Sequence, residues 1–380
     1  ARELAAKFNR ELKPLSYTVK ESSENIASRK ELSVEPNAGC PRYVGRIIEN
    51  VKVAPSPAWL SKLLHAVGLN CVNNVVDVTN FVLMDVGQPL HSFDMDRLEG
   101  NAVKVRKANI GESITTIDHT VHELKETDLV ICDGNRPACV AGIMGGVESE
   151  ITEETRSVFL ESAYFDPKTI RRQSKRLGLS SDSSYRFERG IDPFTQAEMN
   201  DYACALIQEV AGGEILQGRL EYTGDDAKKE PDVLESREER VEKLLGVSIP
   251  ATKIKEYLES IGLKEIAPLR FEIPGFRPDL EREVDLIEEV ARLFGFDNIP
   301  YDLPSFKMAP NELPADERMN RKIRSTLSAM GVHEGLSLRF TSKALTVALF
   351  GENLENDRRS RPAALLNPLS EDLGVLPTSL

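Results

Sequence analysis

The sequence predicts an α+β protein built from several domains, and three observations lead to this class. The chain has 380 residues, which is more than one ordinary hydrophobic core supports, so two or three domains are expected. Short apolar segments bounded by Gly, Asn, Asp or Pro alternate with longer helical patterns, as in a fold that mixes strands and helices. Two polar or proline-rich stretches separate these regions, "TGDDAKKEPD" and "NIPYDLPSFKMAPNELPAD".

The composition is that of a folded soluble protein, with 41% hydrophobic and 29% charged residues. No apolar run approaches the roughly 18 residues that cross a bilayer, and the first residues lack the apolar segment of a signal peptide. We therefore expect a cytoplasmic protein without membrane contact. The five cysteines form no C-x-x-C pair and no zinc-ligand spacing, which predicts reduced, mostly buried thiols.

Residues 1–38 contain a helical stretch, "ARELAAKFNREL", and a polar segment, so we interpret them as a helix and linker remnant of an upstream region. A strand, "RYVGRIIENVKV", is followed by a helix, "SPAWLSKLLHAVG", with Ser56 as its cap and Gly68 at its end. The runs "NNVVDVTNFVLMDVG" and "AVKVRKA" then open a part dominated by short strands. The helix "TQAEMNDYACALIQEVAGG" and the strand "EILQGRLEY" complete a mixed α/β domain at residues 39–222.

A small domain at residues 225–304 is predicted to run helix, helix, strand, helix, in "LESREERVEKLLG", "PATKIKEYLESIG", "LRFEIPGFRPD" and "LEREVDLIEEVARLFG". Its first two helices have the spacing of a helix-turn-helix, but the second carries balanced charges, which argues against DNA binding. Beyond the second linker, the helix "MNRKIRSTLSAMG" and the strand "HEGLSLRFTS" begin a third domain at residues 311–380. We expect that domain to be truncated.

One acidic cluster has the spacing of a cation site. Asp285, Glu288 and Glu289 stand at i, i+3 and i+4 and so share a helix face, and Asp279 precedes them. Neighbouring carboxylates repel one another, which favours a hard cation with oxygen ligands. The alternative is an ordinary solvated acidic face.

A basic segment stands out against a net charge of −13, which on average repels nucleic acid. Residues 168–189 hold seven basic side chains and two acidic ones. A helix beginning at Asp166 and ending at Gly178 would carry four of the basic side chains in i, i+4 pairs, namely Arg171, Arg172, Lys175 and Arg176. Such a surface is typical of a phosphate partner, or it is a solvated basic face.

Three further features leave the chemistry open from the residues alone. The turn "AGIMGG" lacks the G-K-[ST] of a P-loop and the spacing of a dinucleotide fold. Glu161 ends an apolar strand, where it can bind a ligand hydroxyl, pair with a basic group or face water. His91 has no recognisable nucleophile motif beside it, so a hydrolytic triad is not supported and a structural hydrogen bond is the simpler interpretation.

Five motifs together resemble the beta subunit of bacterial phenylalanyl-tRNA synthetase: "NNVVDVTNFVLMDVGQPLHSFD", "AGIMGG", "SDSSYRFERGIDP", "IPGFRPDLEREVDLIEEVARLFGFDNIP" and "NPLSEDL". They occur in order from about Cys40 to the end. The resemblance implies that residues 39–222 form the editing domain of B3/B4 type, which binds tRNA and hydrolyses tyrosine wrongly attached to tRNA(Phe). It also implies a winged-helix-like B5-type domain at 225–304 and the start of a non-catalytic class II synthetase-like domain at 311–380.

The resemblance also implies site residues. The editing pocket maps onto Thr79, His91, Gly145, Glu161, Ser181 and Ser183. In this pocket Glu161 would recognise the tyrosine hydroxyl, and His91 would hydrogen-bond the substrate or a water near the ester, without a protein nucleophile. Ser181 and Ser183 depart from the threonine and alanine frequent in the family, which puts editing efficiency in question.

The same resemblance implies cofactors and partners. Asp279, Asp285, Glu288 and Glu289 would be magnesium ligands shared with the alpha subunit, which uses the ATP. The chain would be part of an alpha2beta2 phenylalanine-tRNA ligase that binds tRNA(Phe), supporting aminoacylation by alpha and proofreading in beta. The competing hypothesis is a tRNA-binding scaffold with an inactive pocket. Neither hypothesis involves DNA.

Overall fold

The computed structural model describes residues 1–134, 136–301, 312–351 and 358–378. The chain divides into two compact units, Ala1–Tyr301 and Asp302–Leu380. Residues 302–311 of the predicted second linker and the last two residues of the "NPLSEDLGVLPTSL" segment lie outside the described residues. The mixed α+β, multidomain class expected from the sequence is confirmed.

Two sheets form the body of residues 21–223 in the larger unit. The first sheet has six strands. Five follow the order β1 (Glu21–Asn25), β12 (Glu214–Gln217), β3 (Arg42–Glu49), β11 (Val158–Tyr164), β4 (Leu90–Asp94), and the sixth, β13 (Leu220–Thr223), also pairs with β3. The second follows the order β10 (Met144–Gly145), β9 (Pro137–Val140), β8 (Leu129–Cys132), β5 (Ala102–Lys107), β2 (Glu31–Val34). A hairpin of β6 (Ser113–Thr115) and β7 (Val121–Glu123) forms a separate two-stranded sheet that packs against β9.

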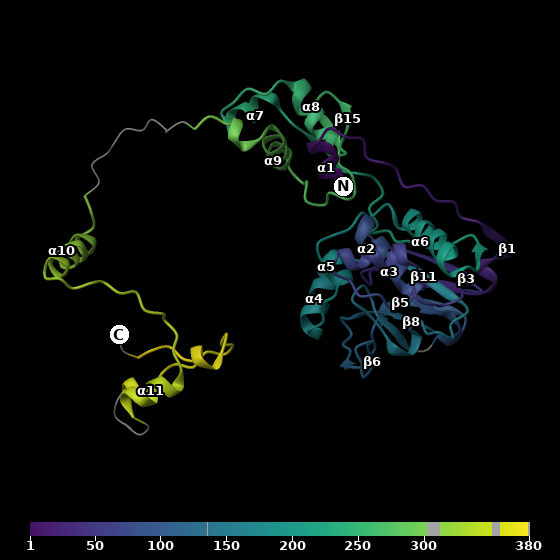
Figure 1. Cartoon of the computed structure of the whole chain (residues 1–380), viewed down its shortest axis with the longest axis horizontal. Coiled ribbons are helices and arrows are strands. Elements are labelled where there is room, and N and C mark those ends of the chain that lie inside the picture. Colours follow the sequence, from purple (N-terminus) through teal and green to yellow (C-terminus); the bar gives the residue numbers. More distant parts are fainter. Residues whose placement is uncertain (135, 302–311, 352–357, 379–380) are drawn as a thin grey trace. The chain divides into compact units, whose positions relative to one another are not determined.

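The first sheet is buried on both faces. Helices α2 (Ala58–Ala66), α3 (Asn74–Val86) and α6 (Gln196–Ala211) lie on one side of β11, and β5 and β8 lie on the other (Figure 1). Alternate residues of β11 enter the two cores: Leu160 packs with the helices, and Phe159 packs with the second sheet. Because side chains alternate across a strand, Glu161 lies on the Phe159 side.

Helix α3 corrects a prediction, because its sequence was expected to belong to a strand-dominated part. The Asn73 side chain accepts the N–H groups of Val75 and Val76 at 3.1 and 2.9 Å and so caps the helix. Val75, Val78 and Val82 are completely buried along one helical stripe. Burial of this stripe outweighs the preference of valine for strands.

Residues 1–38 also differ from expectation. Helix α1 covers only Arg2–Lys7, and β1 and β2 join the two sheets as strands parallel to β12 and β5. An edge strand can be held by backbone hydrogen bonds even when it has few apolar side chains. Strand β1 is mostly exposed, so the hydrophobic pattern of the sequence did not reveal this strand. This segment is therefore part of the sheets rather than only a linker remnant.

The sequence predictions for α6, the strand after it, the cap of α2 and the cysteines are confirmed only in part. The helix at α6 is confirmed, whereas "EILQGRLEY" splits into β12 and β13 around Gly218, whose φ is 83°. Ser56 does not cap α2, because its hydroxyl donates to Asp77 at 2.6 Å. All five cysteines are free, and four of them are buried.

The predicted small domain contains α7 (Glu238–Leu245), α8 (Ala251–Ser260), β15 (Lys264–Ala267), β16 (Arg270–Glu272) and α9 (Glu283–Phe294). The expected order of helices is confirmed. The single expected strand is instead the second arm of the β15–β16 hairpin, and β14 (Val233–Glu235) adds a third strand. Val241, Leu258, Phe271 and Leu286 meet in one buried core. The winged-helix-like description and the domain limits stay predictions.

The second unit contains α10 (Ala315–Ala329), which confirms the predicted helix, and α11 (Lys343–Phe350). The strand expected at 333–342 is not formed in the described part of this unit. Leu336 and Leu338 are 98% and 77% exposed, so no neighbouring strand covers them there. Its relation to a class II synthetase fold stays a prediction. Within the described ranges, no helix has both the length and the apolar character needed to span a membrane.

Candidate functional site

A cavity of about 380 Å³ lies beside the edge strand β4, within the size range of small-ligand sites. Its walls come from α3, β4, β9, β10, β11 and the start of α5 (Asp182–Phe187). The six residues that the resemblance assigned to an editing pocket all line it, although they are spread over more than a hundred positions: Thr79, His91, Gly145, Glu161, Ser181 and Ser183.

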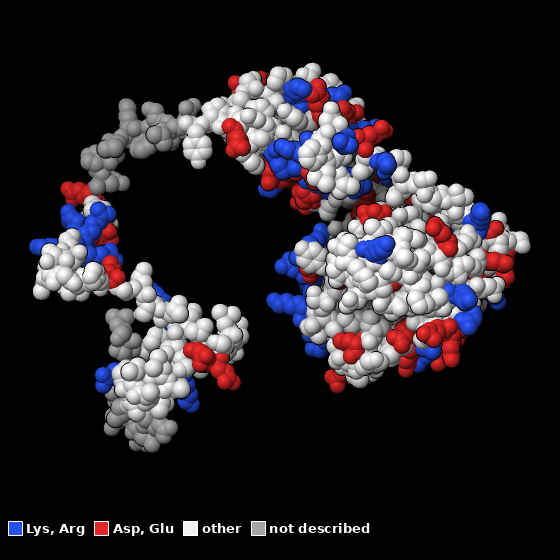
Figure 2. Space-filling view, in the orientation of Figure 1, with Lys and Arg blue, Asp and Glu red and all other residues white. Residues whose placement is uncertain are grey.

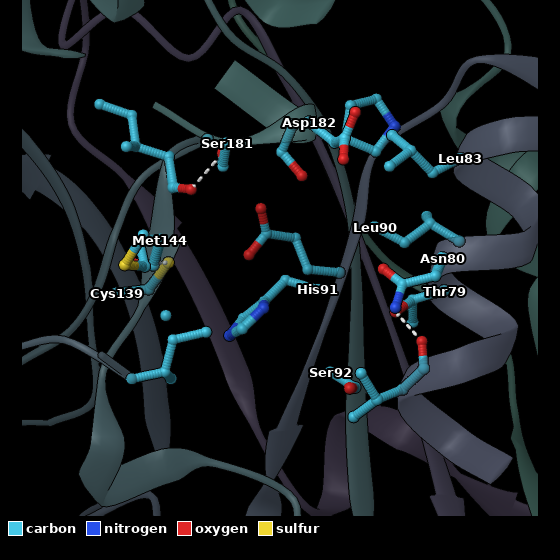
Figure 3. A pocket seen from close by; sticks show the side chains of 18 of the residues that line it. Thr79, Asn80, Leu83, Leu90, His91, Ser92, Cys139, Met144, Ser181 and Asp182 are labelled. Atoms are coloured by element: carbon cyan, nitrogen blue, oxygen red, sulfur yellow. Dashed lines mark hydrogen bonds between the residues drawn. The ribbon is translucent and has the colours of Figure 1, made fainter. Parts of the chain in front are cut away.

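His91 and Glu161 are brought together by strand register. They are directly paired across β4 and β11, and such cross-strand neighbours point to the same face of a sheet. In Figure 3, His91 lies between a wall containing Cys139 and Met144 and a wall containing Thr79. A histidine and a carboxyl group therefore face the same cavity from adjacent strands.

His91 is neutral and open to a ligand. Burial lowers the pKa of its imidazole to about 4, because desolvation disfavours the charged form. The ring packs edge-on against Phe93, with centroids 4.4 Å apart. Among the described residues it has no hydrogen-bond partner, and no serine or cysteine stands in the role of a nucleophile bonded to it. The imidazole can thus orient a substrate or a water, but it is a weak base near neutral pH.

Gly145 makes room for this ring. A Cβ atom on Gly145 would lie 2.5 Å from Cε1 and 2.8 Å from Nε2 of His91, distances that real Cβ contacts do not reach. The backbone of β10 therefore lies directly against the imidazole. The glycine is needed for close approach, since its φ is not in the left-handed region.

Glu161 is 4% exposed, and its carboxyl group is mainly protonated near neutral pH, which is unusual for a glutamate. Burial raises the pKa of its carboxyl group to about 8, and a hydrogen bond from the Tyr43 hydroxyl, 3.3 Å from Oε2, opposes this shift. Near pH 7 the group is mainly protonated, so it can both donate and accept. Sequence reasoning missed Tyr43; the available signal was a tyrosine inside a buried strand, whose hydroxyl needs a partner.

The three hydroxyl side chains that line the cavity, Thr79, Ser181 and Ser183, differ in their hydrogen bonds. Thr79 donates to the carbonyl of Val76 at 2.7 Å, within α3. Ser181 donates to the carbonyl of Ile143 at 2.7 Å and accepts the N–H of Ser184, which caps α5. These two side chains shape the cavity. The Ser183 hydroxyl has no hydrogen-bond partner among the described residues, so it can polarise the pocket.

Comparisons with known proteins identify the family of this chain. Residues 39–212 match the B3/4 domain, residues 234–296 the tRNA synthetase B5 domain, and residues 299–380 the phenylalanyl tRNA synthetase beta chain CLM domain. The phenylalanine–tRNA ligase beta subunit of Syntrophotalea carbinolica is 42% identical over the whole chain. The chain belongs to the phenylalanine–tRNA ligase beta-subunit family.

Other members of this family match equally broadly. The beta subunits of Geobacter metallireducens and Bacillus cereus are 40% and 39% identical over the whole chain. The chain spans about half the length of these relatives, with 48% of the Syntrophotalea protein covered. A crystal structure of an N-terminal fragment of the Pyrococcus horikoshii beta subunit aligns with 77% of this chain and 81% of its own, at 16% identity and a TM-score of 0.38, which is too low to support an argument.

The predicted basic helix is confirmed as α4 (Pro167–Leu177), capped by Asp166, which accepts the N–H of Thr169 at 2.8 Å. Arg176 is not available as expected, because it pairs with Asp128. The other three predicted side chains are exposed and form no ion pair with described residues: Arg171, Arg172 and Lys175. Figure 2 shows basic side chains gathered over α4 and α5.

The predicted acidic cluster is arranged differently from a metal site. Arg277 bridges Asp279 and Glu289, each at 2.9 Å, and lowers the pKa of Asp279. Asp285 accepts the backbone N–H groups of Glu281 and Arg282 at 3.0 and 2.7 Å. No group of three or more His, Cys, Asp or Glu side chains in the described ranges is placed to hold a metal. In this arrangement the Arg277 guanidinium already neutralises two of the expected ligands, Asp279 and Glu289, so a magnesium ion would have to displace it.

Proposed function

We propose that this chain carries the proofreading pocket of a phenylalanine-tRNA ligase and hydrolyses tyrosine wrongly attached to tRNA(Phe). The observation that supports it is the pairing of His91 and Glu161 in one small cavity. The cavity combines a buried polar group for recognition with a neutral imidazole for orientation. Glu161 alone would supply recognition without orientation, and His91 alone would supply orientation without recognition.

Recognition would rest on Glu161. Its carboxyl group lies in apolar surroundings and already accepts a bond from Tyr43. A tyrosyl side chain brings a hydroxyl that pairs with Glu161, whereas a phenylalanyl side chain leaves the carboxyl group without that partner. An unpaired buried polar group costs about 1–3 kcal/mol, which is enough to discriminate between the two side chains.

Hydrolysis would rest on positioning. The neutral His91 imidazole can accept a hydrogen bond from a water or donate one to the ester carbonyl oxygen, and Gly145 presents backbone at the same place. The low pKa of His91 argues against strong general-base catalysis. We infer that water, held in place by the imidazole and the adjacent backbone, attacks the ester carbonyl carbon directly, without a covalent enzyme intermediate. The bond from that carbon to the ribose oxygen breaks, the ribose oxygen takes up the proton that the water loses, and tyrosine and the tRNA hydroxyl are released.

The RNA would be held by α4. Arg171, Arg172 and Lys175 present unpaired positive charge beside α5, and α5 contributes Ser183 to the cavity wall. Phosphate contacts of this kind position a nucleic acid without reading its sequence. The remaining parts of the proposal are a cytoplasmic alpha2beta2 enzyme in which the alpha subunit uses ATP to attach phenylalanine.

This function is tested with the assembled enzyme and tRNA(Phe) charged with tyrosine or phenylalanine, without ATP. We expect the tyrosyl ester to be hydrolysed well above the uncatalysed rate, and faster than the phenylalanyl ester. Replacing His91 with alanine should slow this step by about 100-fold, since lost orientation of water is worth that much. The competing scaffold hypothesis gains support if the RNA binds while both esters decay at the uncatalysed rate.

Magnesium at the acidic cluster stays a prediction, since Arg277 would have to release Glu289 first. It is decided by measuring metal content in the assembled enzyme. We expect the Asp285→Ala variant to hold less magnesium than wild type, because a ligand is lost. Asp316→Ala on α10 is the control, with an exposed carboxylate outside the cluster. Equal magnesium in wild type and Asp285→Ala contradicts the assignment.

A further inference from the structure

An exposed aromatic side chain stands on α5. Tyr185 is 54% exposed, and the guanidinium of Arg189 lies over its ring, 3.5 Å from the centroid. Arg189 also donates to the Tyr185 carbonyl at 2.8 Å, which fixes the stack. A guanidinium over an aromatic face is a favourable cation–π arrangement. The Arg189 guanidinium covers one face of the Tyr185 ring, so the solvent-exposed surface of Tyr185 lies on the other parts of the ring.

Tyr185 does not line the cavity itself, but its helix α5 begins at the cavity wall. Ser181 and Asp182 line the cavity, and the Asp182 side chain is 53% exposed, so this end of α5 is where the cavity meets solvent. Residues three or four apart on a helix are neighbours, with Cβ atoms about 5–6 Å apart. Tyr185 is three residues after Asp182, so the two are neighbours on the helix surface and Tyr185 lies one helical turn beyond the rim that Asp182 forms.

The charge around this rim favours an anionic partner. Helix α4 packs against α5, and Arg171, Arg172 and Lys175 are exposed without ion pairs to described residues. Basic side chains that follow a phosphate backbone, together with an aromatic side chain that stacks a base, are the two elements of single-stranded nucleic-acid binding. Both elements occur here within two consecutive helices.

We propose that Tyr185, supported by Arg189, stacks the terminal nucleobase of the RNA whose aminoacyl ester enters the cavity. This rests on the proposed function, because the ester must be in the cavity for its own ribose to lie at the mouth. The base on that ribose is then the one within reach of a side chain one helical turn away. Tyr185 is thus a positioning residue, and it does not touch the reacting ester.

The test uses the assembled enzyme and tRNA(Phe) whose 3′-terminal nucleotide has 2-aminopurine as its base and carries tyrosine through a non-hydrolysable amide, so it does not depend on hydrolysis. Stacking on an aromatic ring quenches 2-aminopurine, and we expect quenching when wild type is saturated with the RNA. Tyr185→Leu should abolish the quenching and weaken binding by about 10-fold, as expected for one lost base stack. Tyr185→Trp should restore both.

Arg172→Ala on α4 is the matched control. It should weaken binding and reduce its salt dependence while leaving the quenching at saturation intact, because a phosphate contact is lost and the stack is not. Equal quenching in wild type and Tyr185→Leu at saturation overturns the proposal, and so does an absence of quenching in wild type. Quenching by a wild-type enzyme that does not hydrolyse tyrosyl-tRNA(Phe) supports the stack and rejects the proofreading function.

Discussion

Replacing Glu161 with alanine is expected to reduce the preference for the tyrosyl over the phenylalanyl ester by about 10-fold to 100-fold. Glu161 is the buried polar group of the cavity, and its loss leaves the tyrosine hydroxyl without the proposed partner. The measurement is the ratio of kcat/KM for the two charged tRNAs. An unchanged ratio in Glu161→Ala would remove Glu161 from recognition.

The Glu161→Gln variant provides the control and a pH dependence. With a pKa of about 8, the wild-type carboxyl group is mainly protonated at neutral pH and mainly ionised one unit above that pKa. An ionised carboxylate beside a phenylalanyl ring is costlier than a neutral one, whereas a tyrosyl hydroxyl can donate to it. The preference for tyrosine should therefore rise as the pH rises through about 8 in wild type. It should stay flat in Glu161→Gln, which does not titrate there.

Replacing Gly145 with alanine is expected to slow hydrolysis of tyrosyl-tRNA(Phe) by about 100-fold, as much as removing His91. The new methyl group would lie 2.5 Å from the His91 ring, so the imidazole has to move away from its place in the cavity. The backbone itself tolerates alanine at this position, because no positive φ is required. Single-turnover hydrolysis measures the effect.

A double-mutant cycle separates the displaced ring from a general loss of structure. Adding Gly145→Ala to His91→Ala should cost little more than either change alone, because the alanine at 91 no longer meets the new methyl group. Gly335→Ala is the matched control, since nothing lies within 4 Å of a Cβ there. Additive losses in the cycle would mean that Gly145 acts independently of His91.

Helix boundaries were predicted best where local chemistry decides them. Asp166, Pro167 and Gly178 mark the two ends of α4, and the side chain of Asp166 makes the expected capping bond. The same reasoning failed for "NNVVDVTNFVLMDVG", because the burial of Val75, Val78 and Val82 against β-sheet and helix neighbours is not a local property. The edge strand β1 was missed for a related reason, since its stability lies in backbone pairing with β12.

The candidate site could be placed by resemblance but not by spacing. Thr79, His91, Gly145 and Glu161 have no periodic relation in the sequence. Strand register pairs His91 with Glu161, and helix α3 and strand β10 bring Thr79 and Gly145 to the same cavity. Tyr43 was missed because its role depends on a hydrogen bond to a residue 118 positions away. In the acidic cluster, helical spacing placed the carboxylates on one face but could not reveal that Arg277 pairs with Asp279 and Glu289.

The sequence by itself determined the α+β class, the caps of α4, the basic character of that helix and, through its motifs, the family. The tertiary structure alone decided which charges remain free and which groups keep a proton. Arg176 is neutralised by Asp128, whereas Arg171 and Arg172 stay exposed. Glu161 and His91 have opposite pKa shifts and are both uncharged near pH 7, because desolvation disfavours the charged form of each. Desolvation depends on what packs around a group, and packing comes from contacts between distant parts of the chain.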